Sequence, residues 1–154
     1  MTIAKQDLVD GVRFAGERAA AAASYCKDWD HQLGHQWTSG DAFRHVAAVA
    51  GGAQGMYPLL DQGVLSGIPS DKIAENNDKA IANLKEKSRE DVCQAIIDGH
   101  RQSADFIAML DEDDLAKVIT LGGYEMPKAE VLAQIWIHHA IAHAYEASAR
   151  WPIQ

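Results

Sequence analysis

Apolar residues recur every three or four positions along most of the chain, the spacing that lines one face of an α-helix. The first such stretch runs from about residue 4 to residue 26. A more polar segment follows, and Gly34 interrupts it. The apolar face of this first predicted helix consists of Leu8, Val12, Ala15, Ala19 and Ala22.

The second helical stretch begins at Thr38. Thr38 and Asp41 have the spacing of a capping box, in which the two side chains satisfy free N–H groups at the start of a helix. The apolar face of this helix continues to Met56, and Pro58 interrupts it. We therefore expect one continuous helix from the capping box to about residue 56.

Two more helices are predicted before residue 111. Ser70 can cap the first of them, and Ser88 and Asp91 repeat the capping-box spacing at the start of the second, which runs to about Leu110. The inward residues of the helix that follows Ser70 are predicted to be Ile73, Asn77, Ala80, Ile81 and Leu84.

The last third of the chain predicts a short irregular segment and a final helix. Residues 117–126 contain β-branched residues and a Gly-Gly pair, which indicates a loop or a very short hairpin. Pro127 is expected as the first helical residue, since proline is favoured there. The final helix is predicted to run to about Arg150, because Pro152 bars its extension.

Four principal helices predict an all-α fold, a four-helix bundle. The connection from about Pro58 to Lys87 is much longer than the 2–8 residues typical between neighbouring helices of a bundle. It includes a helix of its own, so it can cross the bundle and leave helices 2 and 3 parallel. We expect a single domain over residues 1–154 with a long helical crossover between helices 2 and 3.

Composition narrows the classes of function. The chain has 14 Lys and Arg against 22 Asp and Glu, a formal net charge of −8, so nucleic acid and anionic lipid surfaces are not expected partners. No apolar run approaches the ~20 residues that span a bilayer. The N-terminus lacks the features of a secretory signal, and Cys26 and Cys93 are far apart in the sequence. These features predict a cytoplasmic protein with reduced thiols.

Histidines on the final predicted helix are the strongest chemical signal. His139 and His143 are four residues apart, so their rings project from one face and can bind one cation. They lie on the face that otherwise predicts core, where an imidazole is costly without a partner. The spacing also arises by chance, as a second pair, His31 and His35, shows.

His45 is the candidate third ligand. It lies on the inward face of the second helix, and if that helix and the last one are antiparallel the three rings reach the same level. His100 is a competing candidate, and His138 lies about 100° around the helix from His139. The alternative for His45 is a buried histidine that is bonded to a carbonyl.

Other residues near these positions allow weaker predictions. Glu146, three residues beyond His143, can accept a ring N–H or form a surface salt bridge. Asp41 is expected to cap its helix. Four further candidates could wall the pocket or meet an anionic substrate, although core packing and solvent exposure are the ordinary roles of such residues: Trp37, Trp136, Arg44 and Arg150.

Three segments resemble the DinB/YfiT-like metalloenzyme superfamily, including its mycothiol-dependent maleylpyruvate isomerase branch. The run WTSGDAFRHVAAVA (residues 37–50) is similar to the opening of helix 2 in that superfamily, and HHAIAHAYE (residues 138–146) to its last helix. AENNDKAIANLKEKSREDV (residues 74–92) resembles the crossover and the helix after it. The resemblance covers most of the chain from Trp37 onward and implies a bundle with a long crossover.

The resemblance also implies a metal held by His45, His139 and His143. The isomerase branch usually has a glutamate four residues before its last ligand, where this chain has His139, so the chain departs towards the all-histidine DinB type. Such a site suits zinc or nickel, and also iron or manganese. The implied chemistry is the attack of a low-molecular-weight thiol on a small-molecule electrophile, in a thiol-dependent transferase or isomerase. A metal-dependent hydrolase and a non-catalytic bundle with structural histidines are the alternatives, and a homodimer is the expected assembly.

Overall fold

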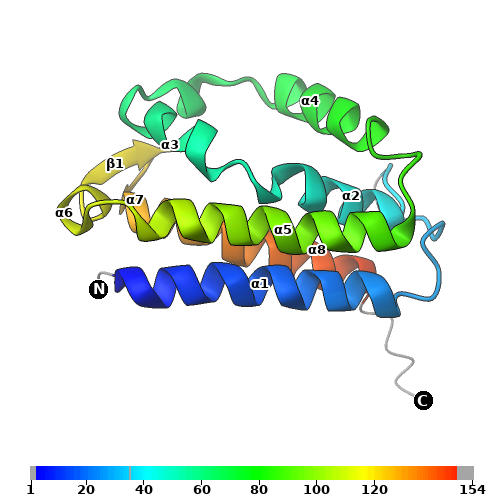
Figure 1. Cartoon of the computed structure of the whole chain (residues 1–154). Coiled ribbons are helices and arrows are strands. Elements are labelled where there is room, and N and C mark those ends of the chain that lie inside the picture. The colour runs from blue at the N-terminus through cyan, green and yellow to red at the C-terminus, as the bar shows by residue number, and fades with distance from the viewer. Residues whose placement is uncertain (1–2, 35, 149–154) are drawn as a thin grey trace, which may run out of the picture.

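Helices from both ends and the middle of the chain lie side by side in the computed structural model, which describes residues 3–34 and 36–148 (Figure 1). The described chain is predominantly helical, with one small two-stranded sheet, which confirms the all-α prediction. The helices that lie side by side are α1 (Lys5–Tyr25), α2 (Ser39–Ala50), α5 (Arg89–Ala108) and α8 (His139–Ser148).

Capping boxes open α2 and α5, as the sequence predicts. The Thr38 hydroxyl accepts from the backbone N–H of Asp41 at 3.2 Å, and the Asp41 carboxylate accepts from the backbone N–H of Thr38 at 3.1 Å. Ser88 and Asp91 make the same reciprocal pair at the start of α5. Each box satisfies backbone donors that a helix start leaves free, so these two boundaries follow from local chemistry.

The second predicted helix is interrupted where Gly99 of α5 packs against its backbone. α2 ends at Ala50 and α3 (Ala53–Asp61) begins after two glycines, so the expectation of one helix to Met56 is wrong. The Ala50 carbonyl accepts from the Ser103 hydroxyl at 2.6 Å and the Trp136 indole N–H at 3.0 Å. A Cβ on Gly99 would lie 2.5 Å from the Cβ of Ala50, so the two helices contact here through backbone. The close contact takes the carbonyl that a continuous helix would use.

The crossover between α2 and α5 consists of α3, η1 (Val64–Gly67) and α4 (Ser70–Ala82). Figure 1 shows it arching over α2 and α5, which run in the same direction. Ser70 does not cap α4: Pro69 is the N-cap, and no side-chain capping bond forms. Ile81 is buried near the end of α4 that packs on α2, but Ile73 is 45% exposed, so its predicted inward position is wrong.

A β-hairpin with a two-residue turn follows α5 and the short helix α6 (Glu112–Leu115). Strands β1 (Val118–Leu121) and β2 (Tyr124–Pro127) are antiparallel, and Leu121 pairs with Tyr124. Gly122 and Gly123 have φ values of 59° and 86°, which the tight hairpin turn requires and which glycine adopts without a steric penalty. The predicted very short hairpin is confirmed. Pro127 ends β2 and caps the next helix, so it is not the first helical residue.

The final predicted helix consists of three consecutive segments. α7 (Lys128–Ala133) leads into a π-helical turn, η2 (Gln134–His138), and then into α8. The His139 backbone N–H donates to the carbonyl of Gln134, five residues back. An α-helix would use the carbonyl four residues back, so the turn contains one extra residue. The predicted end of this helix at Arg150 and Pro152 lies outside the described residues.

A fully buried lysine connects the crossover to this last helical segment. Lys128 Nζ lies 2.7 Å from an Asp61 carboxylate oxygen and 3.2 Å from one of Asp114, and the Tyr57 hydroxyl donates to Asp114 at 2.6 Å. Hydrogen bonds from Lys117 and Tyr57 hold the pKa of Asp114 well below its usual range. Burial, followed by the bond to Asp114, raises the pKa of Tyr57. A buried ammonium group needs such partners, because it has lost its hydration.

The buried core has two halves along the helical layer. One half is built from large aliphatic and aromatic side chains, including Leu8, Ile107, Leu132 and Trp136. The other half is rich in alanine and includes residues of α1, α2 and α8 that flank the predicted histidine site. Small side chains let these helices approach closely. Within the described residues, no helix is both long and apolar enough to cross a membrane.

Candidate metal centre

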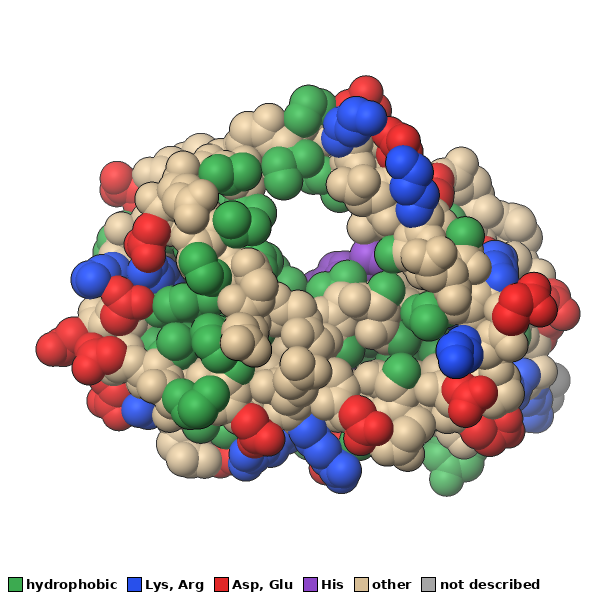
Figure 2. Space-filling model, turned by 45° about the horizontal axis from the view of Figure 1, so that its top comes forward, with side chains coloured by type: hydrophobic (Ala, Val, Ile, Leu, Met, Phe, Trp, Pro, Cys, Tyr) green, Lys and Arg blue, Asp and Glu red, His purple; other side chains and the backbone are tan. Residues whose placement is uncertain are grey.

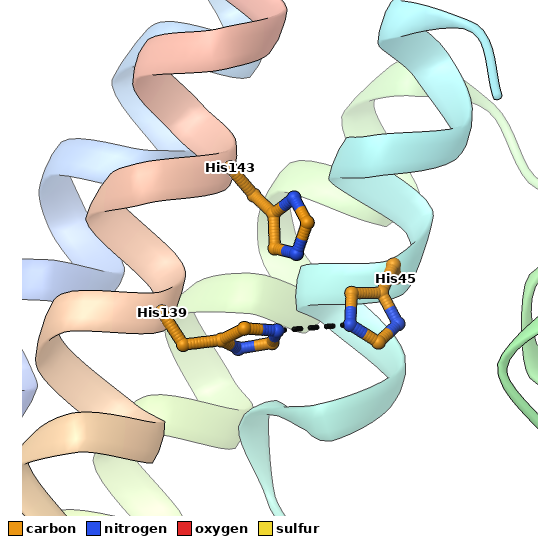
Figure 3. A group of neighbouring side chains, drawn as sticks. All are labelled: His45, His139 and His143. Atoms are coloured by element: carbon orange, nitrogen blue, oxygen red, sulfur yellow. Dashed lines mark hydrogen bonds between the residues drawn. The ribbon is translucent and has the colours of Figure 1, made fainter. Parts of the chain in front are cut away.

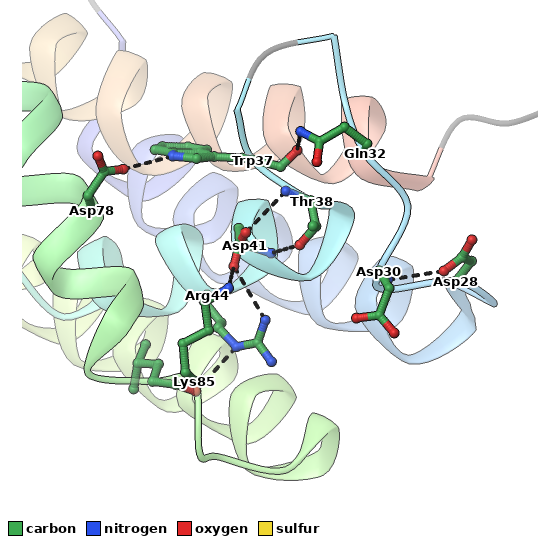
Figure 4. Close-up of polar contacts among 10 residues, drawn as sticks. Asp28, Asp30, Gln32, Trp37, Thr38, Asp41, Arg44, Asp78 and Lys85 are labelled. Carbon is green, nitrogen blue, oxygen red and sulfur yellow. Dashed lines mark hydrogen bonds and ion pairs between the residues drawn. The ribbon is translucent and has the colours of Figure 1, made fainter.

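His45 reaches the site from α2. It lies one turn beyond Asp41, whose capping bonds and ion pair with Lys85 fix the start of the helix (Figure 4). The His45 side chain is buried at 4% exposure, and its Nε2 lies 3.0 Å from Nε2 of His139. Its other ring nitrogen, Nδ1, is buried without any hydrogen-bond partner among the described groups. Nε2 faces the other two rings and Nδ1 faces away from them, so Nε2 is the nitrogen that a ligand between the rings would meet (Figure 3).

His139 and His143 reach the same point from α8. Their ring centroids are 4.6 Å apart, and each lies about as close to the His45 ring, at 4.9 Å and 5.0 Å. The backbone of Ile135 hydrogen-bonds the His139 ring. In the π turn the Ile135 carbonyl is not the acceptor of the His139 backbone N–H. The backbone contact with Ile135 thus orients the first histidine of the pair.

The three imidazoles converge as the sequence predicts. One nitrogen from each ring lies within 4.8 Å of the others, and no acidic or cysteine side chain of the described chain joins the group (Figure 3). Two nitrogens bound tetrahedrally to one ion at ~2.1 Å lie roughly 3.4 Å apart. The His45–His139 separation of 3.0 Å is close to this value and the three nitrogens all lie within 4.8 Å of one another, so the group could hold a metal ion.

Burial keeps two of these rings neutral. Desolvation, and then the charges of His139 and His143, lower the pKa of His45 to about 4. Desolvation, and then the charge of His143, lower the pKa of His139 to about 4. Both rings therefore carry free lone pairs at neutral pH, which is the form that binds a metal.

Glu146 lies against His143. Its Oε2 is 3.2 Å from Nδ1 of His143, in the position from which a carboxylate accepts a ring N–H. Such a bond fixes the ring tautomer and leaves Nε2 for the ion. The structure therefore makes the contact expected from the three-residue spacing.

His100 and His138 lie outside the group. His100 is fully buried in α5, and its Nδ1 is 2.8 Å from the Ile96 carbonyl. Burial lowers the pKa of His100. His138 is exposed, with its Nδ1 3.1 Å from the Gln134 side-chain oxygen. One member of the second sequence pair, His35, lies outside the described residues.

Trp37 walls the site and Trp136 does not. The Trp37 ring centroid lies 5.0 Å from that of His45 and 5.9 Å from that of His143. Its indole N–H donates to Asp78 of α4 at 3.0 Å (Figure 4). Trp136 is buried in the other half of the core, with its N–H bonded to the Ala50 carbonyl. Asp78 was not among the predicted residues, since nothing in its spacing relates it to Trp37.

The predicted arginines do not form an anion site among the described residues. Arg44 Nη1 lies 3.5 Å from Asp41, its Nε donates to the Leu84 carbonyl at 3.2 Å, and its guanidinium covers the Trp29 ring. These contacts occupy the Arg44 guanidinium group. Arg150 lies outside the described residues.

Comparisons of the chain with protein-family models, with curated proteins and with solved structures find no match. The resemblance to DinB-like proteins therefore stays a prediction.

Proposed function

We propose that the protein is a metal-dependent enzyme of the DinB/YfiT-like superfamily, a four-helix bundle in which His45, His139 and His143 hold a divalent transition-metal ion. The observation that carries the proposal is the convergence of three imidazoles from α2 and α8, in which His45 and His139 are 94 residues apart in the chain. Zinc and nickel suit the ligand set best, and iron or manganese also fit imidazole ligands.

His100 shows how this protein treats a purely structural histidine. That ring is buried and its Nδ1 bonds to a backbone carbonyl of its own helix. His45 is almost as deeply buried, yet its Nδ1 has no partner and its Nε2 points at another imidazole. Packing three rings edge-on around one point leaves hydrogen-bonding capacity unused, which favours ligation over a structural role.

Three nitrogen ligands leave coordination positions open, which is typical of catalytic rather than structural sites. When bound, a divalent ion lowers the pKa of a thiol or water molecule and polarises a carbonyl group. The chain supplies the remaining functions: Glu146 holds the His143 tautomer, and Trp37 excludes water from one side. The best-supported reaction class is thiol-dependent transfer or isomerisation of a small electrophile, with hydrolysis as the alternative.

Metal analysis of protein purified without a polyhistidine tag tests the proposal. We expect stoichiometric metal in the wild type and its loss in His139→Ala. His138→Ala is the matched control, because that residue is adjacent in sequence but exposed and outside the group. A wild-type protein that takes up no metal, or a His139→Ala variant that retains it, contradicts the proposal and leaves a structural role for the histidines.

Two model substrates separate the reaction classes. Metal-loaded protein is mixed with a thiol and an activated aryl halide, and separately with an activated ester in the absence of thiol. Thiol-dependent turnover of the halide that is lost in His139→Ala supports a transferase. Ester cleavage alone, lost in the same variant, supports the hydrolase.

A further inference from the structure

A cleft under α4 adjoins the histidine group through Trp37. It has a volume of about 330 Å³ and lies between the segment before α2 and one face of α4. Figure 2 shows an opening beneath the crossover with histidine side chains exposed at its edge. Its lining residues are Gln36, Trp37, Ser70, Ile73, Ala74, Asn77 and Asp78.

We infer that this cleft binds the organic part of the ligand whose reactive atom reaches the histidines, and that it selects uncharged or cationic groups over carboxylates. The inference rests on the proposed function for the position of the reactive atom. The preference for uncharged or cationic groups rests on the residues that line the cleft.

The charge of the cleft is set by Asp78. Its carboxylate accepts from the Trp37 indole N–H at 3.0 Å and from the Gln36 amide at 3.4 Å. Both donors are neutral, and no described lysine or arginine forms an ion pair with Asp78, which is the one charged residue in the described lining of the cleft. The other lining residues contribute hydroxyl, amide and apolar groups.

The lysines near the cleft do not line it, and each contacts another carboxylate. Lys85 binds Asp41, and both line an adjoining cavity that shares Trp37 and Asp78 with the cleft. Lys79 lies 2.6 Å from Glu75 and Lys72 lies 2.7 Å from it. No cation among the described lining residues could therefore pair with a ligand carboxylate, whereas Asp78 repels it.

Three small thiols that differ in charge test the selection. Cobalt(II)-loaded protein is titrated with 2-aminoethanethiol, 2-mercaptoethanol and mercaptoacetate, and the thiolate-to-cobalt absorption reports binding. Each affinity is calculated from the concentration of the ionised thiol, because the three thiols differ in pKa. For an assumed distance of about 10 Å between the Asp78 carboxylate and the charged group of the bound thiol, in a partly solvated site, Coulomb's law gives a difference of about tenfold. We therefore expect the ammonium thiol to bind about tenfold more tightly than the carboxylate thiol, with the neutral thiol between them. Added salt reduces the ratio.

The Asp78→Asn variant removes the charge and keeps an oxygen for the Trp37 N–H. We expect the ratio to fall severalfold in this variant. Asp98→Asn, which makes the same charge change at a position on α5 outside the cleft, is the matched control and keeps the wild-type ratio. A carboxylate thiol that binds as tightly as the ammonium thiol, or a ratio that Asp78→Asn leaves unchanged, overturns the inference.

A second readout separates this inference from the proposed function. In metal-free protein the indole N–H signal of Trp37 is identified by its loss in Trp37→Phe and followed by NMR during the same titrations. We expect 2-aminoethanethiol to shift this signal and mercaptoacetate to leave it in place. Failure to bind cobalt counts against the proposed function only, while an equal response of the signal to both thiols overturns the inference whether or not the protein binds metal.

Discussion

Acidification of the metal-free protein should destabilise it between pH 7 and pH 5. His45 and His139 have pKa values of about 4 in the folded protein, against an ordinary value of 6.5. As the pH falls, the unfolded chain therefore takes up protons before the folded one does. Proton uptake by the unfolded state lowers the free energy of unfolding.

The size of the effect follows from the two pKa values. A group that titrates at 6.5 when unfolded and at about 4 when folded loses about 2 kcal/mol of stability between pH 7 and pH 5. The two rings contact each other and titrate as a coupled pair, so we expect a combined loss of about 3–4 kcal/mol. Most carboxylates remain ionised at pH 5, which makes this window specific for the histidines.

Urea unfolding followed by circular dichroism, with a chelator present, measures this loss at the two pH values. His45→Gln should reduce it by about 2 kcal/mol, because one of the groups with a lowered pKa is gone while His139 and His100 remain. His138→Gln, an exposed residue outside the group, should leave it unchanged. Equal stability at pH 7 and pH 5, or a loss that His45→Gln does not change, would refute the assignment of the pH dependence to these rings.

Two further predictions concern packing and are checked by the same urea unfolding at pH 7. Asp114→Ala should cost about 3 kcal/mol, because the buried Lys128 loses one of its two carboxylates; an unchanged midpoint would contradict this. Gly99→Ala should cost about 2 kcal/mol, because its Cβ would lie 2.5 Å from that of Ala50. Gly55→Ala, with open space around its Cβ, should instead stabilise α3 by about 0.5 kcal/mol, and an equal cost for both variants would contradict the packing argument.

Local chemistry explains the parts of the structure that the sequence could predict. Thr38 and Ser88 begin helices because their side chains bond backbone groups three residues away, within the same short segment. The three-histidine group was predictable because His139 and His143 share a helical face and His45 lies on an apolar face. The contact of Glu146 with His143 likewise follows from a spacing of three residues.

Long-range contacts explain the parts that it could not predict. The break after Ala50 depends on Ser103 and Trp136, which bond its carbonyl from distant parts of the chain. Ile73 is exposed because α4 packs on α2 mainly near its end, and helical periodicity says nothing about that. The contact between Trp37 and Asp78 joins two segments 41 residues apart, with no pattern in either that indicates the other.

The π turn between α7 and α8 places one extra residue in the helical segment that carries His139. An extra residue in a regular helix would rotate the remainder by about 100°, whereas a wider turn takes up that residue locally. Removing one residue between 134 and 138 should therefore leave both histidines aimed at His45. The Ile135 carbonyl would then also lie within reach of the His139 backbone N–H, while its contact with the ring has a counterpart in the regular helix α5, where the Ile96 carbonyl bonds the His100 ring. A shortened chain would keep its ligands and their direction, and the carbonyl that sets the tautomer of one of them would then be shared with a backbone N–H.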